Sequence, residues 1–253
     1  MVTAVPVPHS SWALFLDVDG TLLELAPRPD AVQVPARIKS LLSSLGEAAH
    51  GALALVSGRP IAQLDEWFAP LRLPSAGLHG FERRDSQGKV HRPPYDRRAL
   101  QRARTLLAAS VKAHSGLVLE DKEIALALHY RLAPELEATA REAMARSLEL
   151  AGEDFCVLEG KMVLELKPDG FSKSLAIAAF LAEQPFTGRT PIFVGDDRTD
   201  EAGFSFVEGV GGIAVHVGSA DTRARWRLKN VAAVHEWLGA LLLAQDGPRS
   251  AAH

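Results

Sequence analysis

Four short, continuous apolar runs constrain the fold of this chain more than any other feature. They span residues 13–16, 53–56, 192–194 and 213–215. Runs of this length without polar alternation are typical of strands that are buried on both faces of a parallel sheet. Between them, apolar residues recur at helical spacing, as at Ile38, Leu41, Leu42 and Leu45. Alternating strand and helix patterns of this kind predict an α/β fold with a doubly wound, Rossmann-like parallel sheet.

The middle of the chain follows a different pattern. Residues 124–130 and 162–166 alternate between apolar and other side chains, which is typical of half-buried antiparallel strands. Two stretches with helical character, residues 95–115 and 134–151, accompany them. We therefore predict an inserted α+β domain at residues 81–167, within a core formed by residues 1–80 and 168–253.

Composition excludes several classes of protein. The net charge of −3 and the lack of a basic stripe argue against a nucleic-acid partner. No apolar run approaches the roughly 18 residues that a membrane-spanning helix needs, so we expect no membrane association. The single cysteine, Cys156, cannot form an intrachain disulfide. No signal pattern precedes residue 12, and we expect a cytoplasmic monomer with a frayed polar tail at residues 245–253.

Polar residues follow three of the four buried runs, where the carboxyl ends of parallel strands meet at one edge of the sheet. Two acids that face one small volume repel each other unless a cation lies between them, and this is the setting of a hard-metal site. A hydroxyl, the amides of a helix start and a guanidinium can hold an oxyanion. The residues concerned are Asp17 and Asp19, then Ser57 to Arg59, then Asp196, Asp197, Asp200 and Glu201, with Lys173 near a further helix start.

Each of these motifs also has a plainer explanation. Asp17 and Asp19 could simply open a turn, and Ser57 could mark an ordinary strand-to-helix turn. The acids after Gly195 could cap a helix, and Lys173 could be an ordinary surface lysine. The whole set, in order along the chain, favours a site that handles phosphate and metal. Spacing alone does not distinguish Asp17 from Asp19 as a nucleophile.

The motifs Asp-x-Asp-Gly-Thr, Ser, Lys and Gly-Asp-Asp, in this order, resemble those of the haloacid dehalogenase (HAD) superfamily of phosphotransferases. That resemblance implies that Asp17 is the nucleophile that forms an aspartyl-phosphate, and that Asp19 is the general acid and base. It also implies that Ser57 and Lys173 bind the phosphoryl oxygens. The same resemblance implies that Mg²⁺ is bound by Asp17, the Asp19 carbonyl and Asp196, and that Asp197 and Asp200 support this site.

Within this superfamily, residues 76–82, 119–122, 129–131 and 160–168 resemble the trehalose-6-phosphate phosphatase family, as do residues 199–201. The chain departs from the family at Ser174, where glycine is usual, and at residues 202–204. The resemblance implies a phosphoric monoester hydrolase that converts trehalose 6-phosphate into trehalose and phosphate, in trehalose biosynthesis.

The sugar hydroxyls need many hydrogen-bond donors and acceptors. The residues that could supply them lie in the inserted domain or next to it in the sequence. They are Arg59, His79, Gly80, Glu120, Lys122, His129, Arg131, Lys161 and Glu165. Individually each could be solvated; His129 could be a satisfied half-buried histidine, and Arg131 a structural ion-pair partner. The remaining alternatives are a phosphatase of another sugar phosphate or of a glycosyl phosphoglycerate, and an inactive regulatory module of a synthase.

Overall fold

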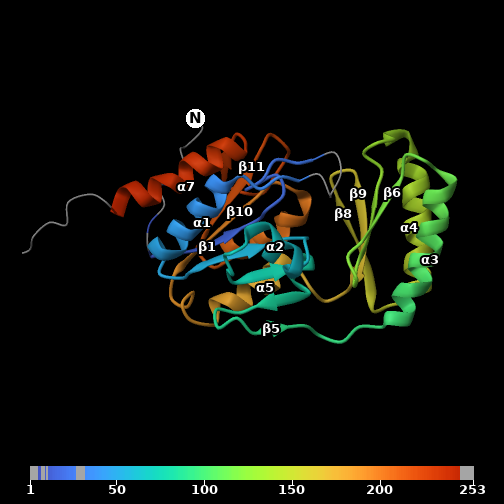
Figure 1. The fold of residues 1–253 in the computed structure, drawn as a ribbon, viewed down its shortest axis with the longest axis horizontal. Helices are drawn as coiled ribbons and strands as arrows, with labels where there is room; N and C mark the ends of the chain where they lie inside the picture. The colour runs from blue at the N-terminus through green and yellow to red at the C-terminus, as the bar shows by residue number, and fades with distance from the viewer. Residues whose placement is uncertain (1–4, 7–8, 10, 27–31, 246–253) are drawn as a thin grey trace, which may run out of the picture.

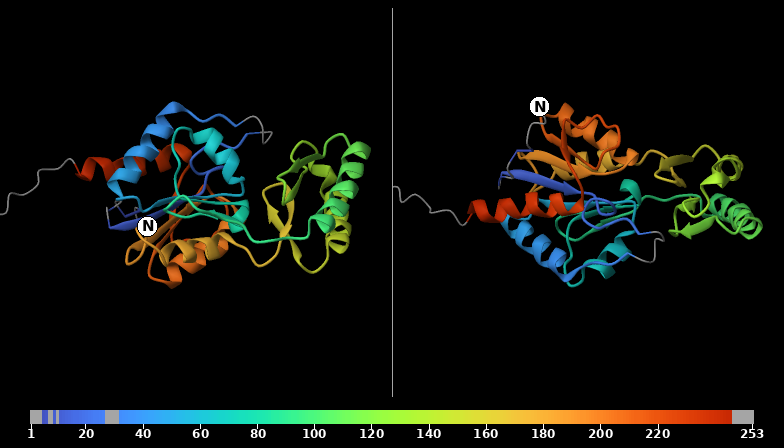
Figure 2. Two further views of the ribbon diagram at one scale, coloured as in Figure 1. Left: turned by 60° about the horizontal axis from the view of Figure 1, so that its bottom comes forward. Right: turned by 90° about the horizontal axis from the view of Figure 1, so that it is seen from above.

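The computed structural model describes residues 5–6, 9, 11–26 and 32–245. A larger α/β core lies beside a smaller domain, the cap, whose helices α3 and α4 are farthest from the core (Figure 1). Two chain segments cross between the core and the cap (Figure 2). This arrangement confirms the predicted α/β core with an inserted second domain.

The described part of the core contains an eight-stranded sheet in the order β12-β11-β10-β1-β2-β3-β4-β5. Strands β12 to β3 run parallel, while β4 and β5 are antiparallel additions at one edge. The four apolar runs form β1 (Trp12–Leu16), β2 (Leu53–Val56), β10 (Thr190–Gly195) and β11 (Ile213–Val217), as predicted. The other core strands are β3 (Ser75–Gly77), β4 (Glu82–Arg84), β5 (Val90–His91) and β12 (Trp226–Leu228).

Helices cover both faces of this sheet, which explains why its central strands are apolar on both sides. Helices α1 (Ala36–Ala48), α2 (Ile61–Phe68) and α7 (Val231–Gln245) pack on one face. Helices α5 (Lys173–Leu181) and α6 (Glu201–Gly209) pack on the other, where Phe180 and Phe204 are fully buried against β1 and β10. The rigid central strands thereby fix the positions of the loops that follow them.

The cap is a four-stranded antiparallel sheet in the order β6-β7-β9-β8, with helices on one face only. Its strands are β6 (Val118–Asp121), β7 (Leu126–His129), β8 (Phe155–Gly160) and β9 (Val163–Pro168), and its helices are α3 (Arg97–Ala113) and α4 (Glu137–Ala151). The alternation seen in the sequence separates the two faces. Leu126, Leu128 and Leu164 point to the helices, whereas Glu165 lies in register with Ala127 on the face toward the core.

The described strands favour a different position for one predicted domain border. We expected the cap to begin at residue 81, but β4 and β5 pair with the core sheet, and the first cap helix begins at Arg97. Short strands at a sheet edge carry too few residues for a periodic pattern to reveal which sheet they join. We propose that the cap spans residues 92–167. Among the described residues, none of the helices has the length and apolar character to cross a membrane. The predicted frayed tail, from residue 246 on, lies outside the described residues.

Candidate active site

Three strand ends of the core meet at one edge of the sheet. Asp17 follows β1 directly, and its backbone amide donates to the Val194 carbonyl of β10 at 2.9 Å. Gly20 then adopts a φ of +79°, and a Cβ at this position would lie 2.0 Å from Oδ2 of Asp196. The turn therefore requires glycine twice, once for its backbone conformation and once for the close approach of Asp196.

The Lys173 ammonium joins two of the acids. It donates to Oδ1 of Asp17 at 2.7 Å and to Oδ1 of Asp200 at 2.6 Å. The lysine is only 4% exposed, and both carboxylates raise its pKa above the usual range although burial opposes them. Ser172 precedes it as the N-cap of α5 and accepts from the Leu175 amide. Lys173 is thus a fixed, buried charge and not the ordinary surface lysine that the sequence also allowed.

Carboxylates of Asp17, Asp196 and Asp200 each place an oxygen within 4.8 Å of the others. Burial raises the pKa of Asp17 to about 7, with Asp200 adding to the effect and Lys173 opposing it. Burial and the charges of Asp17, Asp200 and Asp197 raise the pKa of Asp196 to about 9. A single lysine does not offset this concentration of negative charge, and a divalent cation would.

Asp200 differs from the other two acids because both of its oxygens are engaged within the protein. Its Oδ1 accepts from Lys173, and its Oδ2 accepts from the Asp197 amide at 3.1 Å. Asp197 in turn caps the short helix η4 (Arg198–Asp200) by accepting from the Arg198 amide at 2.7 Å. This capping box holds the loop after β10 in place.

Asp19 forms an ion pair of its own beside that cluster. Its two carboxylate oxygens accept from Nε and Nη2 of Arg59, each at 2.8 Å. The guanidinium lies 4.7 Å above the Trp67 ring and 3.6 Å from Glu120 of the cap. Arg59 follows Ser57, whose buried hydroxyl accepts from the Arg59 amide at 3.1 Å. The Ser-Gly-Arg loop (Ser57, Gly58 and Arg59) therefore holds the Asp19 carboxylate in a bidentate ion pair.

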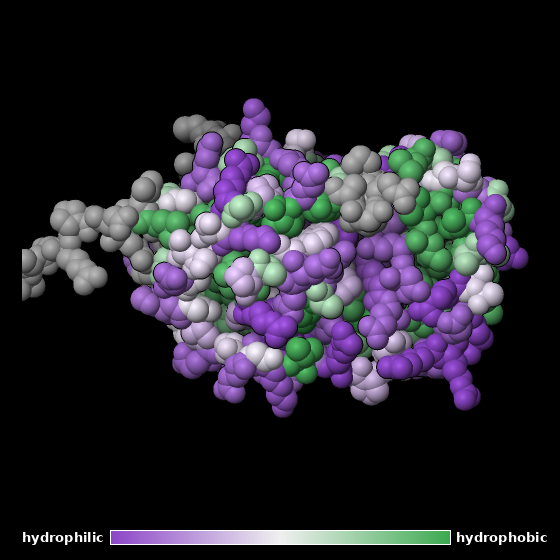
Figure 3. Space-filling model, in the orientation of Figure 1, coloured by the Kyte–Doolittle hydropathy of each residue, from purple (hydrophilic) through white to green (hydrophobic). Residues whose placement is uncertain are grey.

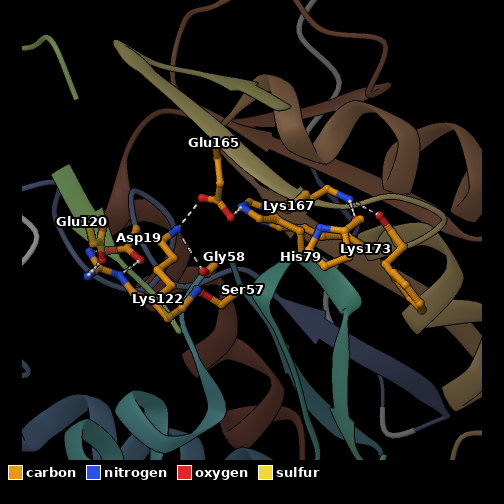
Figure 4. Close-up of polar contacts among 12 residues, drawn as sticks. Asp19, Ser57, Gly58, His79, Glu120, Lys122, Glu165, Lys167 and Lys173 are labelled. Carbon is orange, nitrogen blue, oxygen red and sulfur yellow. Dashed lines mark hydrogen bonds and ion pairs between the residues drawn. The ribbon is translucent and has the colours of Figure 1, made fainter. Parts of the chain in front are cut away.

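Across from the loop, the cap contributes a buried carboxylate, Glu165, and a half-buried lysine, Lys122. The ammonium of Lys122 pairs with Glu165 and donates to the Gly58 carbonyl at 3.2 Å, and Figure 4 shows it between these two groups. His79 of the core lies 3.5 Å from the other oxygen of Glu165. Burial opposes the ionisation of Glu165, but Lys122 and His79 hold its pKa well below the usual range. Burial lowers the pKa of His79 despite the nearby carboxylate.

Two further cap residues line the opening of the site. His129 lies 2.9 Å from Glu120, and this contact, together with the charges of Lys122 and Arg59, outweighs burial and lowers the pKa of Glu120. Arg131 donates to the Ala26 carbonyl of the core at 2.9 Å and to the Lys161 carbonyl at 3.2 Å. In the lower part of the face shown in Figure 3, the surface between core and cap is mostly hydrophilic.

These groups surround a pocket of about 150 Å³ between core and cap. Most of the predicted site residues line it: Asp17, Asp19, Arg59, His79, Glu120, Lys122, His129, Arg131, Lys161, Glu165, Lys173, Asp196 and Asp197. Ser57, Gly80 and Asp200 do not line it; a Cβ at Gly80 would lie 2.4 Å from the Ser172 carbonyl, so this glycine serves chain packing. Sequence reasoning missed Leu158 and Val163, which also line the pocket. The period-two alternation with Glu165 could have identified Val163.

Comparison with known proteins gives the family. The sequence model described as trehalose-phosphatase matches residues 15–232. Over 248 residues the chain is 43% identical to the trehalose-6-phosphate phosphatase of Escherichia coli (strain K12), a match that covers 98% of this chain and 93% of that protein. The chain belongs to the trehalose-phosphatase family. The resemblance that the cap motifs suggested is therefore confirmed.

Solved structures agree with this trehalose-phosphatase assignment at the level of the fold. The C-terminal domain of Candida albicans trehalose-6-phosphate phosphatase superposes with a TM-score of 0.81 at 22% identity, covering 91% of each chain. A HAD superfamily phosphatase from Bacteroides thetaiotaomicron superposes with a TM-score of 0.60 at 17% identity, covering 90% of this chain and 94% of that one. The core and cap described above thus share the overall fold of these two phosphatases.

Proposed function

We propose that this phosphoric monoester hydrolase cleaves trehalose 6-phosphate to trehalose and phosphate, through an aspartyl-phosphate on Asp17 and with Mg²⁺. The observation that carries the proposal is the position of Asp17 and Asp196 at strand ends, with Lys173 beside Asp17 at the start of α5. These three residues line a pocket together with the cap residues Lys122 and Glu165. The family match and the 43% identity to a trehalose-6-phosphate phosphatase support the choice of substrate.

The donor set fits Mg²⁺, which prefers oxygen ligands. Because both oxygens of Asp200 are already engaged, we assign the metal to Asp17, Asp196 and the Asp19 carbonyl, with Asp197 and Asp200 as supports. When bound, the ion neutralises charge on the phosphoryl group and its surroundings. Burial, together with the neighbouring carboxylates, raises the pKa values of Asp17 and Asp196, and such an ion would favour their ionised forms.

In the proposed reaction, a carboxylate oxygen of Asp17 attacks phosphorus and the bond from phosphorus to the sugar oxygen breaks. Lys173 and Ser57 bind phosphoryl oxygens. Asp19 gives a proton to the departing sugar oxygen and then takes one from the water that hydrolyses the aspartyl-phosphate. For this, Asp19 must exchange its ion pair with Arg59 for the leaving oxygen, so we assign Arg59 to the placement of Asp19 as well as to the substrate.

The cap side of the pocket provides the sugar contacts in this proposal. Sugar hydroxyls act as donors and acceptors, and the groups around the pocket offer both kinds. We assign this role to His79, Glu120, Lys122, His129, Arg131, Lys161 and Glu165. The pocket of about 150 Å³ is smaller than the roughly 300–1,000 Å³ of most ligand pockets. A phosphorylated disaccharide would therefore enter only after the cap moves away from the core.

A panel of substrates tests this function. We expect phosphate release from trehalose 6-phosphate far above that from sucrose 6-phosphate, glucose 6-phosphate or a mannosyl phosphoglycerate. We also expect EDTA to stop release and Asp17→Asn to abolish it. Preference for another sugar phosphate would contradict the substrate, and release by Asp17→Asn at the wild-type rate would contradict the aspartyl-phosphate. An inactive regulatory protein would release phosphate from none of them.

A further inference from the structure

Helix α2 begins without a cap of its own. Pro60 occupies the N-cap position and contributes no side-chain hydrogen bond, although the first amides of a helix need acceptors. The acceptor comes instead from a distant strand, because Oε1 of Glu82 on β4 accepts from the Ile61 amide at 2.5 Å. A carboxylate at a helix N-terminus also interacts favourably with the helix dipole. Glu82 therefore fixes the start of the helix that directly follows the Ser-Gly-Arg loop.

The Glu82 carboxylate lies close to the backbone of that loop. A Cβ at Gly77 would lie 2.7 Å from Oε1 of Glu82 and 2.8 Å from the Arg59 carbonyl, so glycine leaves room for the carboxylate at this point. The Leu78 amide donates to the same Arg59 carbonyl at 3.1 Å. Glu82 and the chain between β3 and β4 thus fix the position of the Ser-Gly-Arg loop.

Glu82 is fully buried, and its counter-charge comes from the first segment that leads into the cap. Its Oε2 accepts from Nε of Arg92 at 2.7 Å and lies 2.6 Å from Nη2. Arg92 follows β5, and its Nη1 lies 3.9 Å from Glu123, the neighbour of Lys122 in the cap. A buried charge that loses its partner is strongly unfavourable. The environment of Glu82 therefore depends on where the cap segment lies.

We propose that Glu82 is a positioning residue, which holds the Ser-Gly-Arg loop for phosphate binding and depends on Arg92 of the cap segment for its charge. The proposal rests on the function proposed above. When the cap is seated, Arg92 neutralises Glu82 and the start of α2 is fixed. When Arg92 moves away, the uncompensated carboxylate disturbs the loop, so that cap position and phosphate binding are linked through Glu82.

The test compares Glu82→Gln, Arg92→Gln and the double variant with a matched control, Arg83→Gln. Arg83 is on the same strand and pairs with Glu183 of the core at 2.7 Å, away from the loop. Glutamine keeps an acceptor oxygen for Ile61 but removes the charge. Turnover is measured with trehalose 6-phosphate and with p-nitrophenyl phosphate, together with inhibition by inorganic phosphate and the thermal midpoint.

We expect Glu82→Gln to lower kcat for both substrates by a common factor of about 10 or more, since small misplacements in a site can cost that much. The inhibition constant of inorganic phosphate should rise with it. The double variant should lose less than the product of the single losses, because the buried Glu82 charge and its Arg92 counter-charge disappear together. Arg83→Gln should lower the thermal midpoint but leave kcat within about twofold, as expected of a distant, independent site.

Wild-type kcat in both Glu82→Gln and Arg92→Gln would overturn the proposal. So would an equal loss of kcat in Arg83→Gln at a matched thermal midpoint, because a stability effect would then suffice. Arg92→Gln changes a side chain that is 43% exposed and provides the test should Glu82→Gln not fold. Failure of the wild type on trehalose 6-phosphate would contradict the proposed substrate alone, since p-nitrophenyl phosphate still reports on the loop.

Discussion

Replacing the proposed nucleophile should make the metal-free protein more stable. Asp17 is buried beside Asp196 and Asp200, and its pKa rises from 3.8 to about 7. One unit of pKa corresponds to about 1.4 kcal/mol, so the ionised carboxylate destabilises the fold by about 4 kcal/mol above neutral pH. Water that enters the site and side chains that relax reduce this figure. We expect Asp17→Asn to raise the free energy of unfolding by about 2–4 kcal/mol without metal.

The effect has a defined pH dependence. Between pH 3.8 and about 7 the folded protein keeps a proton on Asp17 that the unfolded chain releases. The free energy of unfolding of the wild type should therefore fall as the pH rises through this window. The stability difference between Asp17→Asn and the wild type should be near zero at about pH 4 and reach its full size above about pH 7. Mg²⁺ should reverse the order, because it binds the native wild type in preference to the unfolded chain.

Thermal unfolding in EDTA and in Mg²⁺, at about pH 4 and about pH 8, measures this. At about 2–4 °C per kcal/mol for a chain of this size, the variant should melt at least about 4 °C higher in EDTA at the higher pH. Asp19→Asn is the matched control and should not stabilise, because it breaks the ion pair with Arg59. The reasoning would be refuted if Asp17→Asn in EDTA were no more stable than the wild type at about pH 8. It would also be refuted if the stability difference between the two proteins were as large at about pH 4 as at about pH 8.

Three further predictions concern the pocket. Lys122→Met should lower kcat/KM for trehalose 6-phosphate by about 10–100-fold, which is the effect of losing one hydrogen bond to a charged group. Turnover of p-nitrophenyl phosphate, which has no sugar, should stay within about threefold of the wild type. Equal losses for the two substrates would contradict a sugar contact by Lys122. The depressed pKa of Glu165 contributes stability that is present above pH 4.5 and lost as the pH falls below it. In Glu165→Gln, the free energy of unfolding measured with urea should therefore decrease less steeply below pH 4.5 than in the wild type. Gly58→Ala would place a Cβ 2.6 Å from Nε2 of buried His79 and should lower kcat/KM by about tenfold or more. Gly209→Ala is the control, because a Cβ there would meet no other element of the protein within 4 Å, and it should match the wild type in the same assay.

The meeting of the strand ends was predictable from sequence because it depends only on sheet topology. Continuous apolar runs predicted β1, β2 and β10, and these are neighbours in the sheet. Residues that follow neighbouring parallel strands must lie at one edge. The proximity of Asp17 and Asp196 could therefore be inferred before any side chain was placed.

The orientation of individual side chains could not be inferred in that way. Asp19 turns to Arg59, forty residues later in the chain, because Trp67 and Glu120 fix the guanidinium from two different elements. No local pattern encodes such a contact. Likewise, Glu82 stands on a three-residue strand, which is too short for periodicity to assign it to the core sheet or to show that it caps α2.

The contacts between cap and core have a consequence for how such proteins can diversify. Lys122 and Arg131 of the cap bind the core through the carbonyls of Gly58 and Ala26, which are backbone atoms. Every residue type offers a carbonyl, so substitutions on the core side leave these two acceptors intact. Caps exchanged between relatives should therefore keep these two contacts on a foreign core, and substrate range could change through the cap while the proposed reacting groups of the core stay as they are.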